Sequence, residues 1–285
     1  MPGKPAIRNV TLPDGRSLRV REWAGEGRPF VLLHGLLDDA MGWSQLARQT
    51  TRPCLAMDLP GFGGSDLPTR PRISAYAEDV AAALDGLDVE DCVLVGHSLG
   101  GAVAAGVAER SRRVGALALL APAGFGSIRV AEAFALPGII HVAMVALPLS
   151  LVNPLTVTAA YTTFVARRRL PPRELTERLR RRAFQSAPGV RMAVTAIAAA
   201  GRSPNGFPQR RIRFDGPVAA LWGARDPLVP VGHAEALRAA LPQAKIEVWP
   251  AMGHHPQNER PEELHEFLEE CARPWRDAPR LRRAA

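Results

Sequence analysis

Val93-Leu94-Val95-Gly96-His97-Ser98-Leu99-Gly100-Gly101 decides how the rest of this 285-residue chain is interpreted. The apolar residues Cys92 to Val95 predict a strand buried on both faces, and Ala102 to Ala105 begin a helix. Between them stands Gly-x-Ser-x-Gly, a sharp turn in which the glycines leave room for a strained serine. The turn exposes the Ser98 hydroxyl and places the Leu99 amide where it can bind an anion. On the pattern alone, a glycine-rich turn with a bystander serine is an equal alternative.

A serine hydroxyl is a poor nucleophile near neutral pH and needs a base, which in turn needs an orienting acid. Two later segments supply candidates for these roles. Trp222-Gly223-Ala224-Arg225-Asp226-Pro227 follows an apolar strand, and Ala251-Met252-Gly253-His254-His255-Pro256 lies near the C-terminus. The chain order is therefore serine, aspartate, histidine.

Two further motifs complete a resemblance to the α/β-hydrolase family. His34-Gly35 follows the strand Phe30 to Leu33 and matches the oxyanion loop of that family. Asp58-Leu59-Pro60-Gly61-Phe62-Gly63-Gly64-Ser65 matches its Asp-x-x-Gly-x-Gly-x-Ser turn. The resemblance implies an α/β fold, with a mostly parallel, doubly wound sheet and an inserted helical cap.

The resemblance also implies roles for individual residues. Ser98 would be the nucleophile, His254 the base and Asp226 its orienting acid. The backbone N–H groups of Leu36 and Leu99 would bind the oxyanion. No metal and no organic cofactor is implied.

Two choices between neighbouring candidates remain. Some members of the family that this chain resembles place the acid after the strand that here is Val114 to Ala121. That strand ends without a carboxylate, so the resemblance leaves Asp226 as the main candidate for the acid. His254 follows a glycine, which lets the loop bend there, whereas His255 precedes a proline that restricts its backbone. We therefore assign the base to His254.

Residues in the substrate pocket are harder to choose. His255 is placed at the rim of the pocket, with Leu37 and His141 as further contacts. For His141, a satisfied histidine in the core is the default interpretation.

The alternation of strands and helices divides the chain into a core, 1–121 and 216–272, a cap, 122–215, and a loose tail, 273–285. The cap contains a stretch, Ala133 to Ala166, without Asp, Glu, Lys or Arg. Five residues divide that stretch into pieces too short to span a membrane: Pro137, Gly138, Pro148, Asn153 and Pro154. We expect short helices that line an apolar pocket, with docking on a membrane surface as the weaker alternative. A charged helix is predicted over Pro171 to Gln185.

Composition excludes several other classes of protein. The net charge of +8 comes almost entirely from scattered arginines, which is typical of solvated helix faces rather than of a nucleic-acid site. Three distant cysteines, Cys54, Cys92 and Cys271, give neither a disulfide framework nor a zinc site. The N-terminal residues lack the apolar core of a signal peptide, so we expect a cytoplasmic protein. The sequence does not predict an oligomeric state.

The expected activity is hydrolysis of a carboxylic ester of an apolar small molecule. A carbon–carbon hydrolase of the meta-cleavage type is the alternative, but the sequence departs from its usual pattern at Leu36-Leu37-Asp38, His97 and His255. A cofactor-free perhydrolase or an acyltransferase also remains open. The non-enzymatic alternative is a ligand receptor on the same fold.

Overall fold

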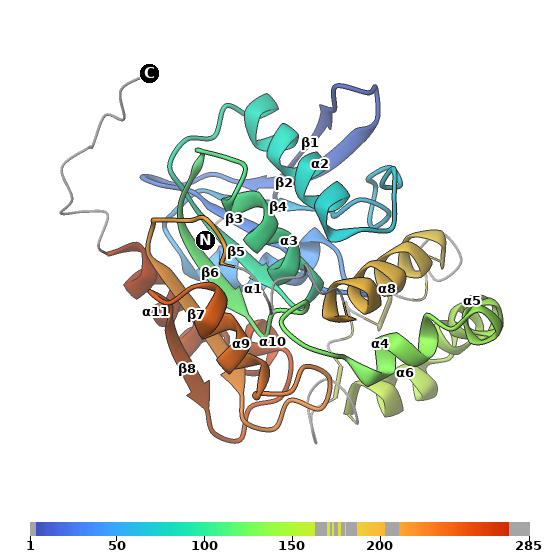
Figure 1. Cartoon of the computed structure of the whole chain (residues 1–285). Helices are drawn as coiled ribbons and strands as arrows, with labels where there is room; N and C mark the ends of the chain where they lie inside the picture. Colours follow the sequence, from blue (N-terminus) through green and yellow to red (C-terminus); the bar gives the residue numbers. More distant parts are fainter. Residues whose placement is uncertain are drawn as a thin grey trace.

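The structure, a computed structural model, describes residues 4–162, 187–202 and 211–273, with six isolated positions between 170 and 180. A sheet of eight strands runs through the molecule in the order β1-β2-β4-β3-β5-β6-β7-β8, with helices on both faces (Figure 1). The strands are β1 Ala6–Thr11, β2 Ser17–Trp23, β3 Phe30–Leu33, β4 Cys54–Met57, β5 Cys92–His97, β6 Val114–Leu120, β7 Val218–Gly223 and β8 Lys245–Trp249. This architecture confirms the predicted fold class.

The direction of the strands follows from their connections. β1 and β2 form an antiparallel hairpin whose turn contains Gly15 at a φ of 87°. β2 pairs with β4 in antiparallel register, and every later pairing is parallel. Parallel strands bring their carboxyl ends to one edge of the sheet, so β5, β7 and β8 all deliver their following loops there.

Two apolar cores hold the sheet between its helices. One face is covered by α2 Ile73–Gly86, α3 Leu99–Ala108 and α9 His233–Ala240. The other is covered by η1 Ala40–Trp43, α1 Ser44–Gln49 and α11 Pro261–Ala272. Strand β5 is buried throughout because it lies between two strands and between two helical layers. Burial also raises the pKa of the Cys54 and Cys92 thiols to about 12 each.

Between β6 and β7, the longer stretches that the structure describes form four helices, which lie together beside the core (Figure 1). They are α4 Arg129–Phe134, α5 Pro137–Val152, α6 Pro154–Ala160 and α8 Ala187–Arg202. The expected divisions are present at Pro137-Gly138, where α5 begins after α4, and at Asn153-Pro154, where α6 begins after α5. The expected division at Pro148 is wrong, because α5 continues through that residue. A proline removes one helical hydrogen bond and can kink a helix without ending it. Among the described residues, no helix is long and apolar enough to span a bilayer.

The helices of this segment meet the core at close backbone contacts. A Cβ on Gly189, near the start of α8, would overlap the carbonyl oxygen of Gly61. Gly61 belongs to the predicted Asp-x-x-Gly-x-Gly-x-Ser turn and has a φ of 84°. Glycine is needed at both positions because two backbones touch there. Most of the charged helix predicted over 171–185, and the tail beyond Arg273, lie outside the described residues.

Candidate active site

Ser98 occupies the turn between β5 and α3, at the carboxyl edge of the sheet. Its backbone has a φ of 54° and a ψ of −115°, which is a strained conformation for a residue with a side chain. These angles show the strain that the pattern Gly-x-Ser-x-Gly predicts. Neighbouring glycines allow the turn, since a Cβ on Gly100 would overlap the carbonyl oxygen of Leu33. Ser98 is also largely buried, with 8% of its surface exposed.

His254 and Asp226 lie against each other at the same edge. The Nδ1 atom of His254 is 2.7 Å from Oδ2 of Asp226, and the two side chains are 3% and 0% exposed. The other carboxylate oxygen of Asp226 accepts the backbone N–H groups of Leu228, at 2.8 Å, and Val229, at 2.9 Å. These bonds hold the carboxylate in one orientation, so it fixes the orientation of the imidazole.

The loop after β3 passes directly beside Ser98. A Cβ on Gly35 would lie 3.2 Å from Cβ of Ser98, so only glycine lets the loop come this close. His34 is buried and holds the loop, because its Nδ1 bonds the carbonyl of Gly35 and its Nε2 accepts the N–H of Leu59. Leu36 and Leu37 follow, half-buried, and Leu37 has a φ of 61°. The placement of the loop is compatible with the predicted use of the Leu36 N–H.

Two side chains hold the backbone around His254. The Nε2–H of His97 donates to the carbonyl oxygen of His254 at 2.8 Å. The carboxylate of Glu259 accepts the N–H of Gly253 at 2.9 Å and that of His255 at 3.1 Å. The carbonyl of the proposed base, and the N–H groups before and after it, are therefore all bonded. The sequence did not predict either contact.

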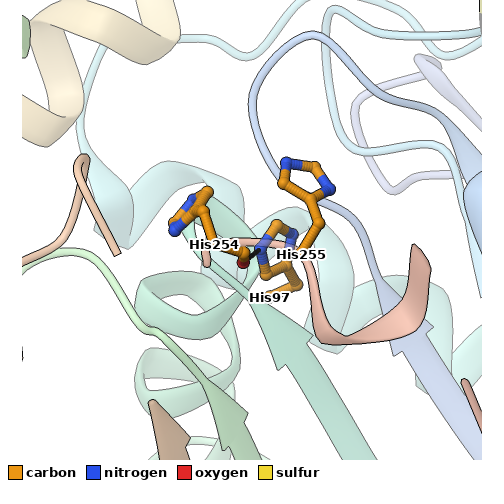
Figure 2. A group of neighbouring side chains, drawn as sticks. All are labelled: His97, His254 and His255. Atoms are coloured by element: carbon orange, nitrogen blue, oxygen red, sulfur yellow. Dashed lines mark hydrogen bonds between the residues drawn. The ribbon is translucent and has the colours of Figure 1, made fainter. Parts of the chain in front are cut away.

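His255 lies beside the same cluster but turns its ring elsewhere. Figure 2 shows the rings of His254 and His255 on different sides of their loop, with His97 near both. The rings of His97 and His255 meet edge to face, with centroids 4.5 Å apart. The amide nitrogen of Gln257 lies 3.3 Å from Nδ1 of each of these two histidines. Burial holds the pKa of His97 and of His255 well below the usual value, with the neighbouring histidines as a smaller cause.

Three imidazoles this close raise the question of a metal. One nitrogen from each of His97, His254 and His255 lies within 4.8 Å of the others. However, His97 donates through Nε2 to a carbonyl and faces the Gln257 amide with Nδ1, while Nδ1 of His254 is bonded to Asp226. Metal ligation needs one free lone pair from each ring, all directed at one point. The cluster is therefore better described as a hydrogen-bond network, and we assign no metal to it.

Other predicted residues have structural positions. Asp58 accepts the N–H groups of Ala40 and Gly64 and bonds Arg19, so it holds the turn to which it belongs. Asp39 caps η1. The interpretation of His141 as a core histidine is wrong: it is exposed on α5, because the adjacent Ile140 occupies the inward position. A pocket role for His141 is untested.

The sequence of the chain is similar to those of several known proteins. The sequence model of the alpha/beta hydrolase family matches residues 30–267. The chain is 32% identical, over 261 residues, to the dihydrolipoyllysine-residue acetyltransferase component of the acetoin cleaving system of Pseudomonas putida. That match covers 89% of this chain but 66% of the component, so the chain spans less than two thirds of its length.

Two further similarities bear on the reaction. The chain is 28% identical to the 2-hydroxy-6-oxononadienedioate/2-hydroxy-6-oxononatrienedioate hydrolase of Comamonas testosteroni, covering 82% of this chain and 84% of that enzyme. Among solved structures, a bacterial membrane phospholipase A superposes with a TM-score of 0.74 at 26% identity, covering 96% of this chain and 88% of that one.

Proposed function

Because this chain belongs to the alpha/beta hydrolase family, we propose that it is a serine hydrolase that cleaves a carboxylic ester of an apolar small molecule. The observation that carries the proposal is the bond from His254 Nδ1 to the buried carboxylate of Asp226, at the sheet edge where Ser98 stands in a strained turn. Strained nucleophile, histidine and carboxylate are the parts that acyl transfer requires.

Proton transfer follows from the tautomer that Asp226 favours. A carboxylate accepts a hydrogen bond, so the neutral imidazole of His254 carries its proton on Nδ1 and a lone pair on Nε2. Nε2 takes the proton of the Ser98 hydroxyl as Oγ attacks the ester carbonyl. Asp226 then stabilises the imidazolium that forms.

Backbone N–H groups would stabilise the negative charge that develops on the substrate oxygen. The attack gives a tetrahedral intermediate, whose oxyanion would accept the N–H groups of Leu36 and Leu99. His254 returns its proton to the departing alcohol, which leaves an acyl group on Ser98. A water molecule, deprotonated by His254, attacks the acyl carbon and releases the acid, so Ser98 regains its proton.

Labelling with a fluorophosphonate probe tests this mechanism. The wild-type chain should form a covalent adduct on Ser98, and Ser98→Ala should fold normally, remain unlabelled and retain only a small residual rate. Asp226→Asn should lower the rate by up to about ten-thousand-fold, because the amide favours the other tautomer. Near-normal ester turnover by a folded Ser98→Ala protein would refute the proposal.

The dependence of kcat/KM on the length of the acyl chain should identify the class of substrate. We propose that residues 122–215 form a cap over the site, and the described cap side chains that point inward include Ile140, Val157 and Tyr161. Each acyl methylene buried against such a surface contributes up to about 0.8 kcal/mol, or about fourfold in kcat/KM. Efficiency should therefore rise along an ester series until the pocket is full. A series that declines from acetyl onward would indicate a small or polar substrate.

A carbon–carbon hydrolase is the second candidate, and the similarity to the Comamonas enzyme favours it. The same serine mechanism could act on a ketone whose departing group is a stabilised carbanion. Turnover of 2-hydroxy-6-oxononadienedioate should be compared with that of butyrate esters. A higher kcat/KM for the former would make this the correct assignment.

Acyl transfer to an acceptor other than water is the third candidate. It draws on the similarity to the Pseudomonas acetyltransferase component. Adding alcohol or thiol acceptors to the ester assay would reveal it as a new acylated product.

A further inference from the structure

Helix α5 turns an apolar stripe toward solvent. Successive residues of an α-helix are rotated by about 100°, so Ile139, Val142 and Leu149 fall within one quarter of its circumference. Their side chains are 44%, 69% and 59% exposed. Ile140 is buried and faces the molecule. The exposed stripe is therefore the outward face of a helix that lies at the outer edge of the structure, at the right of Figure 1.

The stripe belongs to a larger group of exposed apolar residues. Among the residues that the structure describes, twelve large hydrophobic residues are exposed, and seven of them lie between 130 and 155. They are Val130, Phe134, Leu136, Ile139, Val142, Leu149 and Leu155. Single exposed hydrophobic residues are ordinary, but a group concentrated on consecutive helices indicates an interaction surface. We call these seven residues the cap patch.

The charge of the chain is concentrated in the same segment. Residues 122–215 contain 14 arginines and 4 acidic residues, a net charge of +10, so the rest of the chain has a net charge of −2. The arginines flank the uncharged stretch instead of interrupting it. Among the described residues, Arg129, Arg173, Arg180 and Arg191 are exposed. The cap therefore combines an apolar patch with a positive segment, whereas the core offers neither.

We propose that the cap patch docks this protein on a lipid bilayer surface that contains anionic headgroups. An apolar helix face bordered by arginines is typical of helices that lie in the plane of the interface, where apolar side chains enter the acyl region and arginines meet lipid phosphates. A protein partner with an apolar surface would not require the charge. The proposal goes beyond the proposed reaction, because docking is measured without catalysis.

The helix geometry supports a parallel orientation rather than insertion. α5 has 16 residues, which at about 1.5 Å per residue span roughly 24 Å, less than the hydrocarbon core of a bilayer. α5 contacts α4, α6 and α8, and among its described side chains the stripe of Ile139, Val142 and Leu149 is available to lipid. The expected binding is shallow and reversible, and sensitive to salt.

Co-sedimentation of the full chain with vesicles tests the apolar part. The probes are phosphatidylcholine vesicles with and without about 30% phosphatidylglycerol. We expect binding to the anionic vesicles and at least about tenfold weaker binding of the variant Ile139→Gln, Val142→Gln, Leu149→Gln. Ile7→Gln with Val248→Gln is the matched control, since both residues are exposed on the core. The control should bind as the wild type does, and both variants should keep its melting temperature.

Charge reversal tests the electrostatic part. Arg129→Glu with Arg191→Glu should weaken binding to anionic vesicles more than Arg48→Glu with Arg238→Glu, which makes the same change in net charge on the core. About 0.5 M NaCl should weaken wild-type binding. The proposal is overturned if anionic vesicles do not bind the chain or if the α5 variant binds them unchanged. It is also overturned if light scattering finds an oligomer that the same variant dissociates.

Discussion

Helices α3 and α5 are both apolar in composition, but they differ in their surroundings. Leu99–Ala108 and Pro137–Val152 both lack charged residues. Every residue of α3 is buried, whereas α5 exposes Ile139, Val142 and Leu149. Small residues let α3 pack closely on β5 and β6, and α2 covers its other side. An apolar sequence thus indicates that a helix needs a partner but does not say whether the fold provides one.

The difference also separates two kinds of contribution to function. The α3 side holds Ser98 and the loop of His254 in fixed positions, so changes there should reduce the chemical rate. The outward face of α5 contacts nothing in the described structure that the reaction uses, so changes there should leave the hydrolysis of a soluble ester intact. Four predictions test this separation, and the largest effect comes first.

The two adjacent histidines should differ most. His254→Ala removes the proposed base, which is bonded to Asp226, and should lower kcat by about a million-fold. His255→Ala removes a ring that packs on His97 and should change mainly KM. Steady-state kinetics on one ester, with melting temperatures as the control for folding, measures both. The reverse pattern in two folded proteins would show that the base is assigned to the wrong residue.

His97 should act as a positioning residue for the base. His97→Leu loses the bond to the His254 carbonyl and should lower kcat by about ten- to a hundred-fold with little change in KM. His97→Asn, which keeps an N–H donor, should recover part of the loss.

A buried residue far from the site provides the control for His97. Leu84→Ala in α2 should lower the melting temperature without lowering kcat. The low-field proton resonance of the His254 Nδ1–H should broaden in His97→Leu and persist in the control. Equal kcat losses in the two variants would reduce His97 to a purely structural role.

Replacing glycine with alanine should lower the stability of the protein in α3 and raise it in α5. Gly100→Ala in α3 places a Cβ that overlaps the carbonyl oxygen of Leu33 and should cost roughly 2–3 kcal/mol of stability. Gly138→Ala in α5 meets nothing within 4 Å and should add about 0.5 kcal/mol. Denaturant unfolding measures both values. A destabilising Gly138→Ala would show that α5 has a closer neighbour than the structure describes.

Acid should weaken the buried histidine cluster. The pKa values of His97 and His255 are lower in the folded chain than the ordinary value of 6.5, so the unfolded chain binds more protons below that pH. Their contribution to stability is complete above about pH 6.5 and falls as the pH drops toward the folded pKa values. The loss is up to about 1.4 kcal/mol per pH unit for each histidine. His255→Asn should flatten the fall in melting temperature between about pH 7.5 and 5.

The sequence predicted local structure better than distant contacts. β3 begins and ends where the apolar pattern placed it, because a strand buried between helices leaves a continuous apolar run. The bond between His254 and Asp226 was also predicted, since chain order and motif together identify both. Pro148 was misjudged, because neighbouring helices can support a helix that its own sequence disfavours.

The hydrogen bonds of His97 and Glu259 could not be predicted. His97 lies 157 residues from the carbonyl that it bonds, and no local pattern records such a distance. An acidic residue soon after the base was visible in the sequence. Its use as an acceptor for two N–H groups, however, depends on the turn into α10, Pro256–Glu259.

The bond from His97 to the loop of His254 has a mechanical consequence. His97 immediately precedes Ser98, so the end of β5 supports the proposed nucleophile and also carries the side-chain donor that holds the loop of the proposed base. When thermal motion displaces the end of that strand, both groups are displaced in the same direction. Fluctuations shared by two atoms cancel in the distance between them. Correlated motion of this kind would let Ser98 and His254 keep their separation while the sheet as a whole vibrates.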